Sequence, residues 1–121
     1  MLLVEDEDML RHGLSKMLRK HGFSVIEAGN GSAALDLVRS YRNNIEVILL
    51  DLTIPGAPSR EVVAEAQRIQ PGVKVILMSA YSRGMAPAAL NVPEVKGFIR
   101  KPFQTRDLVQ LLRDTMSAER S

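Results

Sequence analysis

The sequence lacks cysteine, contains few aromatic residues and has no apolar run longer than five residues. The lack of cysteine excludes disulfide bonds and cysteine-ligated metal sites, and it suits a reducing, cytoplasmic setting. The short apolar runs exclude a transmembrane helix. We also expect no signal peptide, because acidic residues directly follow the opening Met-Leu-Leu-Val.

The charge balance gives little support for nucleic-acid binding. The formal net charge is only +2 and aromatic residues make up 4% of the chain, without the interleaved basic and aromatic pattern of single-strand binders. With 121 residues, of which 45% are apolar and 25% charged, the composition indicates one ordinary globular domain over residues 1–121.

Five apolar segments alternate with segments of helical periodicity. The predicted strands are residues 2–4, 23–27, 45–51, 73–79 and 96–101, and the predicted helices are residues 8–21, 32–41, 59–70 and 105–117. The third and fourth strands have nearly continuous β-branched apolar cores, which is typical of strands buried on both faces of a parallel sheet. The alternation predicts an α/β, flavodoxin-like (βα)5 doubly wound sandwich with strand order 2-1-3-4-5.

The helix ends carry recognisable signals. Gly22 suits the position after the first helix, Ser32 suits the N-cap of the second helix, and Ser59 suits the start of the third. Residues 82–95 contain one glycine and two prolines that interrupt the pattern, so we expect the fourth helix of this fold to be irregular.

Polar residues follow four predicted strands at the points where the strands end. Glu5 and Asp6 follow the first strand, Asp51 ends the third, Ser79 ends the fourth and Lys101 ends the fifth. Because the carboxyl ends of parallel strands meet at one edge, we expect these side chains to lie close together beside the switch point of the sheet.

This set of residues predicts a phosphoryl-transfer site with Asp51 as nucleophile. Three converging carboxylates repel one another, and without a cation one of them would have to take up a proton. Oxygen-only ligands favour Mg²⁺ or Mn²⁺, and Mg²⁺ leaves coordination positions open to a phosphoryl oxygen. Lys101 and the Ser79 hydroxyl would supply a positive charge and a hydrogen-bond donor to that group.

Each of these residues also has a plainer interpretation. Asp51 alone suits a turn or a helix cap, Lys101 before a proline suits a solvated turn, and Ser79 alone is uninformative. We interpret Glu7 and Asp8 as acids that compensate the positive end of the first helix. The joint placement of an acid pair, an aspartate, a serine and a lysine at successive carboxyl ends favours the site.

Together these motifs resemble the receiver domain of response regulators in two-component signalling. "LLVEDE" resembles its first strand and acid pair, "VILLDLTIPG" its phosphoacceptor segment, "VILMSAY" its fourth strand and "GFIRKPF" its Lys-Pro ending. The resemblance covers essentially the whole chain. It implies a phosphoacceptor switch that catalyses its own phosphorylation and slow dephosphorylation without being a turnover enzyme.

The resemblance also implies residue roles. Asp51 would accept a phosphoryl group from a phosphohistidine, and Lys101 would pair with the phosphoryl oxygens. Mg²⁺ would be held by Asp51, by Asp6 directly, by Glu5 through a water, and by the backbone carbonyl of Thr53.

Four residues would respond to or control the phosphoryl group. Ser79 and Phe98 would be the switch residues, although a strand aromatic such as Phe98 equally suits core packing. Thr53 and Tyr81 would tune the access of the hydrolytic water to the acyl phosphate.

The implied partner is a histidine kinase or a histidine phosphotransfer domain. The basic residues Arg11, Lys16, Arg19 and Lys20 of the first helix would either dock that partner or form a solvated face. We expect no direct contact with nucleic acid or membrane, and a monomer or weak dimer in the cytoplasm, whether or not a parent protein is membrane-anchored. The irregular segment 82–95 and the lack of room for an effector favour the receiver module of a hybrid histidine kinase, with a stand-alone single-domain response regulator as the alternative.

Three other function classes stay open at this point. "DLT" faintly resembles the nucleophile motif of haloacid-dehalogenase-type phosphatases, but Thr53 stands where those enzymes normally have a second acid. A flavodoxin-like FMN module needs a phosphate loop rich in serine, threonine and glycine after the first strand, and that loop is acidic here. A degenerate receiver used only for protein contact would not need the complete set of site residues.

Overall fold

The computed structural model describes residues 1–80, 90 and 92–117, and a parallel five-stranded sheet forms its centre. The elements along the chain are β1 (Leu2–Val4), α1 (Asp8–Lys20), β2 (Ile26–Ala28), α2 (Gly31–Tyr41), the 3₁₀ helix η1 (Arg42–Asn44), β3 (Val47–Asp51), α3 (Ser59–Ile69), β4 (Lys74–Ser79), β5 (Val95–Arg100) and α4 (Thr105–Ser117). The strand order is β2-β1-β3-β4-β5, and all neighbouring pairs are parallel. The predicted flavodoxin-like sheet is therefore confirmed. Most of the segment expected to form an irregular helix lies outside the described residues.

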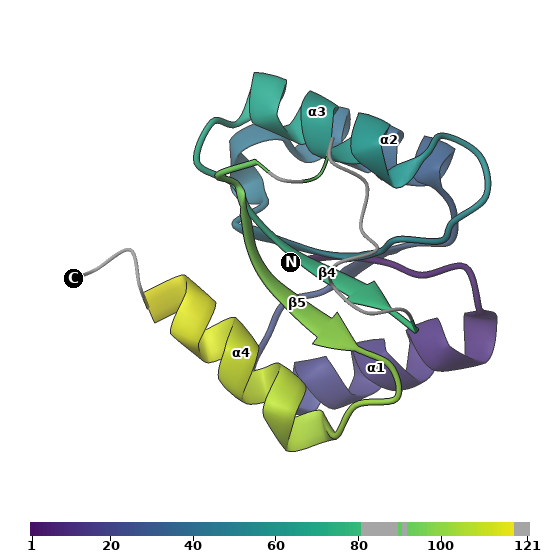
Figure 1. The fold of residues 1–121 in the computed structure, drawn as a ribbon, viewed down its shortest axis with the longest axis vertical. Helices are drawn as coiled ribbons and strands as arrows, with labels where there is room; N and C mark the ends of the chain where they lie inside the picture. The colour runs from purple at the N-terminus through teal and green to yellow at the C-terminus, as the bar shows by residue number, and fades with distance from the viewer. Residues whose placement is uncertain (81–89, 91, 118–121) are drawn as a thin grey trace.

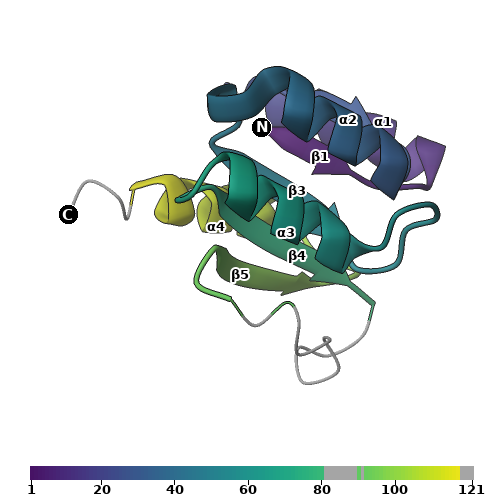
Figure 2. The same ribbon diagram turned by 90° about the horizontal axis from the view of Figure 1, so that it is seen from above.

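Helices cover both faces of the sheet. In Figures 1 and 2, α2 and α3 lie on one face, and α1 and α4 lie on the other. Successive strand residues alternate between the two faces, so Leu2, Ile48 and Leu50 belong to the core under α2 and α3, whereas Leu3 and Leu49 belong to the core under α1 and α4. All five side chains are fully buried. Apolar packing on both faces thus fixes the positions at which the strands end.

The second strand starts later than predicted, at Ile26 instead of residue 23. The residues before it are used to end α1. The Gly22 amide donates to the Arg19 carbonyl and the Phe23 amide donates to the Leu18 carbonyl, which is the hydrogen-bond pattern of a Schellman motif. The other predicted element boundaries lie within two residues of the observed ones.

The N-cap of α2 is Asn30, so the prediction that Ser32 caps this helix is wrong. The Asn30 side-chain oxygen accepts a hydrogen bond of 2.8 Å from the Ala33 amide. Gly31 is the first helical residue, and a Cβ there would lie 1.7 Å from the Ala57 carbonyl oxygen. A glycine at this position allows α2 to pack directly against the loop that follows β3.

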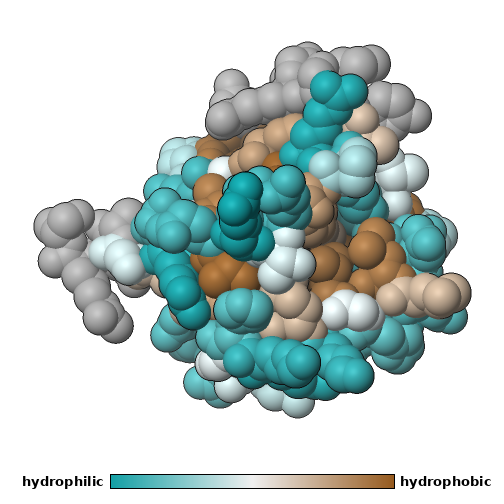
Figure 3. All heavy atoms as spheres, turned by 90° about the horizontal axis from the view of Figure 1, so that it is seen from below, coloured by the Kyte–Doolittle hydropathy of each residue, from teal (hydrophilic) through white to brown (hydrophobic). Residues whose placement is uncertain are grey.

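The outer surface of the α1 and α4 layer is mixed in polarity. Figure 3 shows hydrophilic side chains surrounding small apolar areas on this side of the molecule. The described part of the chain contains no helix with the length and apolar character that a membrane span requires.

Replacing the glycine after α1 and the glycine within α1 by alanine should change the free energy of unfolding in opposite directions. Gly22 has φ +91°, so Gly22→Ala forces alanine into a left-handed conformation and should lower the free energy of unfolding by about 1 kcal/mol. Gly13 lies inside α1, and a Cβ there would meet nothing within 4 Å. Gly13→Ala should therefore raise the free energy of unfolding by roughly 0.5–1 kcal/mol. Urea unfolding of both variants checks this, and shifts of the same sign would contradict the described end of α1.

Candidate functional site

The residues expected at the carboxyl edge of the sheet do meet there. Glu5 lies just beyond β1, Asp51 is the last residue of β3, Ser79 is the last residue of β4, and Lys101 follows β5. Because all neighbouring strands are parallel, these ends lie at the same edge of the sheet. The fold therefore gathers residues that are up to 96 positions apart in the sequence.

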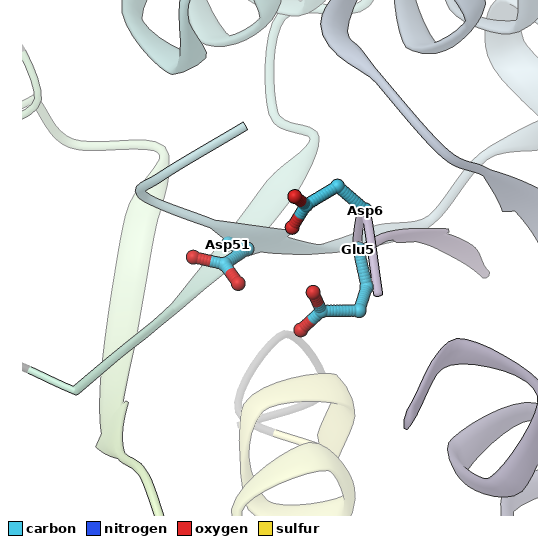
Figure 4. Close-up of side chains that lie close together, drawn as sticks. All are labelled: Glu5, Asp6 and Asp51. Carbon is cyan, nitrogen blue, oxygen red and sulfur yellow. The ribbon is translucent and has the colours of Figure 1, made fainter. Parts of the chain in front are cut away.

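Three carboxylates form the centre of this edge. One oxygen from each of Glu5, Asp6 and Asp51 lies within 4.8 Å of the others. Figure 4 shows the three carboxyl groups close together, with Glu5 and Asp6 extending from the segment after β1 and Asp51 from β3. Glu5 and Asp51 are 1% and 5% exposed, whereas Asp6 is exposed to solvent. The cluster is thus open to solvent at Asp6 and closed to solvent at Glu5 and Asp51.

Lys101 supplies positive charge to the two buried acids. Its Nζ atom lies 2.5 Å from Glu5 Oε1 and 2.5 Å from Asp51 Oδ2. The sequence interpretation assigned Lys101 to a bound phosphoryl group and overlooked this pairing. With Asp6 included, three carboxylates face one ammonium, which leaves two net negative charges when all groups are ionised.

Burial and pairing act in opposite directions on the ionisation of this cluster. Burial raises the pKa of Glu5, the hydrogen bond from Lys101 opposes that effect, and the pKa remains above its usual value. Burial by itself would lower the pKa of Lys101, but the hydrogen bonds to Asp51 and Glu5 and their charges outweigh it, and the pKa of Lys101 is raised. Lys101 therefore stays an ammonium at neutral pH.

Backbone and hydroxyl groups hold the acids in place. Asp51 Oδ1 accepts a 2.9 Å hydrogen bond from the Thr53 amide, and Glu5 Oε2 accepts one of 3.1 Å from the Glu7 amide. The buried Ser59 hydroxyl donates to the carbonyl oxygen of Asp51 at 2.8 Å and to that of Leu52 at 3.1 Å. Sequence reasoning assigned Ser59 only to the start of a helix, because its contact with the end of β3 depends on the tertiary fold.

The remaining predicted site residues lie around this centre. Ser79 is 2% exposed, and its carbonyl accepts a 2.7 Å hydrogen bond from the Lys101 amide, which ties the end of β4 to the end of β5. Phe98 is on β5, beside Leu77, and packs partly buried against the core under α2 and α3. The Thr53 side chain is exposed next to the acid cluster. Tyr81 lies outside the described residues.

The basic residues of α1 do not form one exposed face. Lys16, Arg19 and Lys20 are exposed, but the Arg11 side chain is only 13% exposed and is paired with Asp8. The prediction that Arg11 is available to an acidic partner is therefore wrong. Asp8 lies in the first turn of α1, as expected of an acid near the positive end of a helix.

A pocket of about 510 Å³ lies away from the acid cluster, at the other end of the sheet. It is lined by residues at the starts of β4 and β5 and by the last turns of α4, among them Val73, Lys74, Lys96 and Leu111. None of the described site residues contributes to it, so it is not the site described above.

The donor chemistry of the acid cluster fits a hard divalent cation. The three converging side chains offer only carboxylate oxygens, which such cations prefer. Two net negative charges remain after pairing with Lys101, and a divalent cation would balance them. Asp51 thus offers a buried carboxylate beside an ammonium and next to two further acids.

Comparisons with known proteins identify one family. The family model described as the response regulator receiver domain matches residues 1–113. The sensor kinase CckA of Brucella abortus is 27% identical over 118 residues, which cover 98% of this chain and 12% of that kinase. The chain spans between 12% and 55% of the length of the first curated relatives that it matches.

Solved structures give the same result. The receiver domain of the hybrid histidine kinase CckA superposes with a TM-score of 0.81 and 25% identity, covering 95% of this chain and 96% of that one. The response regulator TrrA from Thermotoga maritima, solved in complex with Mg²⁺ and BeF, superposes with a TM-score of 0.81 and 27% identity, covering 94% of this chain and 96% of that one.

The pairing of Lys101 with two buried acids predicts a stability effect. Lys101→Met leaves Glu5 and Asp51 without their counter-charge and should lower the free energy of unfolding in EDTA by about 2 kcal/mol. The matched control is Lys96→Met on the exposed side of β5, which should change little. In an Asp51→Asn background the effect of Lys101→Met should shrink, because one of the two unpaired charges is gone. Equal effects of the two lysine variants in urea unfolding would contradict the pairing.

Proposed function

The chain belongs to the response regulator receiver domain family, and from this premise we propose that it is a phosphoacceptor switch in which Asp51 accepts a phosphoryl group from a phosphohistidine. One observation carries this proposal. The nearly buried Asp51 carboxylate lies 2.5 Å from the Lys101 ammonium and within 4.8 Å of the carboxylates of Glu5 and Asp6. A nucleophilic acid, a cation for the phosphoryl oxygens and further acids for a metal thus meet at one edge of the sheet.

Mg²⁺ is the metal that we propose for this site, with Mn²⁺ as a substitute. Asp6 and Asp51 would hold it directly, Glu5 through a water, and Thr53 through its backbone carbonyl. When bound, the ion would neutralise the charge of the acids and of the incoming phosphoryl oxygens. The exposed position of Asp6 supports entry of the ion from solvent.

The reaction at Asp51 is a transfer between two nucleophiles. An Asp51 oxygen forms a bond to phosphorus while the bond from phosphorus to the histidine nitrogen breaks, and the histidine leaves with the electron pair. Lys101 would follow the charge from Asp51 to the new phosphoryl oxygens, since it already contacts Asp51 Oδ2. A hydrolytic water later attacks phosphorus, the bond from phosphorus to Asp51 breaks, and inorganic phosphate leaves, which returns Asp51 to a carboxylate. The exposed Thr53 would tune the access of this water, and so would Tyr81.

The signal would leave the site through Ser79 and Phe98. Ser79 ends β4 and is joined to the Lys101 amide through its carbonyl, so a change at the phosphoryl group would reach both β4 and β5. Phe98 follows on β5, three residues before Lys101. We propose that the Ser79 hydroxyl turns toward the phosphoryl group and that Phe98 changes rotamer with it.

The cellular context is a separate part of the proposal. Similarity to the sensor kinase CckA and to its receiver domain supports a receiver module of a hybrid histidine kinase, with a stand-alone cytoplasmic regulator as the alternative. In either case the donor would be a histidine kinase or a histidine phosphotransfer domain.

Small-molecule phosphodonors test the role of Asp51 without the unknown kinase. Acetyl phosphate with Mg²⁺ should add one phosphoryl group to the wild-type chain, as measured by intact-protein mass spectrometry, and EDTA should prevent the addition. Asp51→Asn should remove the labelling, whereas Asp36→Asn, which changes an exposed acid of α2, should retain it. Equal labelling of Asp51→Asn and wild type would contradict the proposal. Wild-type protein that acetyl phosphate and Mg²⁺ do not label would also contradict it.

Neighbouring acids should differ sharply in their effect on metal binding. Asp6→Asn removes a proposed ligand and should weaken Mg²⁺ binding by more than the roughly 10- to 100-fold typical of losing a residue that only supports a ligand. Glu7→Gln should have little effect, because the Glu7 amide, and not its carboxylate, contacts Glu5. Calorimetric titration with Mg²⁺ checks this pair, and equal losses would place the metal elsewhere.

A further inference from the structure

Arg11 connects the metal-binding segment to the rest of the molecule. From α1, its Nη1 atom donates a 2.9 Å hydrogen bond to the backbone carbonyl of Glu5, and its Nη2 atom donates one of 2.8 Å to Asp8 Oδ1. The side chain is 13% exposed. Arg11 thus binds both ends of the short segment, residues 5–8, that carries two of the three clustered acids.

The same guanidinium is fixed from the side of β2. Its Nε atom lies 3.3 Å from Glu27 Oε1, and Glu27 is a β2 residue with 21% side-chain exposure. Gly29 leaves room for the guanidinium, because a Cβ at Gly29 would lie only 3.1 Å from Arg11 Nη1. The Glu5 amide also donates to the Ala28 carbonyl at 3.1 Å. The end of β1 is therefore held to the end of β2, with Arg11 between them.

Asp6 depends on this arrangement more than its neighbours do. Glu5 and Asp51 each have Lys101 and a backbone amide as partners. Among the described residues, no hydrogen bond or ion pair holds the Asp6 carboxylate. Its position is set by the backbone of the segment, which Arg11 fixes one residue earlier, at the Glu5 carbonyl.

We propose that Arg11 is a positioning residue for the metal site, which presents Asp6 and Glu5 to the ion by holding the backbone between β1 and α1. This inference rests on the proposed function, since it assigns Arg11 a part in binding the Mg²⁺ of that site. Arg11 contacts neither the ion nor the phosphoryl group in this role. It acts through the Glu5 carbonyl and Asp8.

Charge and position predict opposite effects when Arg11 is removed. Arg11 is a cation close to a cation-binding site, so its charge alone repels the ion, and its loss would tighten Mg²⁺ binding. If Arg11 positions the ligands, its loss weakens binding, because the metal must then order the segment that carries Asp6. The sign of the change therefore separates the two effects.

The test is a calorimetric titration with MgCl₂ that measures the dissociation constant for Mg²⁺. An ionic strength of about 0.15 M largely screens the surface charges. Arg11→Ala should raise the dissociation constant for Mg²⁺ about tenfold. Arg11→Lys keeps the charge, but a lysine has no planar fork that could contact the Glu5 carbonyl and Asp8 at once. Most of the loss of Mg²⁺ affinity should therefore persist in this variant. The control is Arg19→Ala, which removes the same charge from the same helix. Arg19 reaches Glu27 at 3.8 Å and the Val25 carbonyl at 2.9 Å without touching residues 5–8, and its variant should bind Mg²⁺ like wild type.

The outcomes separate this inference from the proposed function. Wild-type or tighter Mg²⁺ binding by Arg11→Ala, in a protein whose wild type binds Mg²⁺, overturns the role of Arg11 and leaves the proposed function standing. Equal weakening by Arg19→Ala also overturns it, because the effect would then come from the helix surface in general. A wild-type chain that binds no Mg²⁺ overturns both. If Arg11→Ala does not fold, Arg11→Lys decides, and wild-type affinity in that variant contradicts the positioning role.

Discussion

The contact of one lysine with two buried acids is the interaction on which the site depends. Lys101 Nζ lies 2.5 Å from both Glu5 and Asp51, so three strands that are distant in the sequence meet through one ammonium. Without it, two carboxylates that are almost fully buried would face each other unpaired. With it, Asp51 stays beside a cation, which in the proposed reaction a phosphoryl group would share. The feature that stabilises the resting site is thus also the one that would prepare it for the proposed transfer.

The rest of the fold serves to hold this edge in register. The sheet is packed on both faces by apolar clusters, so its strands end at defined positions. The loops are then tied by specific contacts: Ser59 to the Asp51 carbonyl, Arg11 to the Glu5 carbonyl, and Gly31 against Ala57. Such contacts hold the acids in place, so the proposed metal would lose less free energy in ordering its ligands.

The strand order and the convergence of the acids and the lysine could be predicted from the sequence, because both follow from where the strands end. Apolar segments and their spacing predicted the strand order, and parallel strands bring Glu5, Asp51 and Lys101 to one edge whatever the details. Predictions failed where the local sequence around a residue is compatible with more than one structural role. Arg11 looks like part of a basic helix face until Glu27 of β2 is seen beside it, and Ser32 looks like a cap until Asn30 is seen to fill that place. The pairing of Lys101 with the acids required distances, which no sequence pattern contains.

The central claim is that Asp51 accepts a phosphoryl group and that the change spreads along the carboxyl edge of the sheet. The most direct measurement is an NMR titration of amide shifts with beryllofluoride and Mg²⁺, a phosphoryl mimic that needs no kinase. The account predicts shifts at Asp51, at the segment after β1 and at the ends of β4 and β5, and their loss in Asp51→Asn. Unchanged spectra of the folded wild-type protein, or the same shifts in Asp51→Asn, would contradict it.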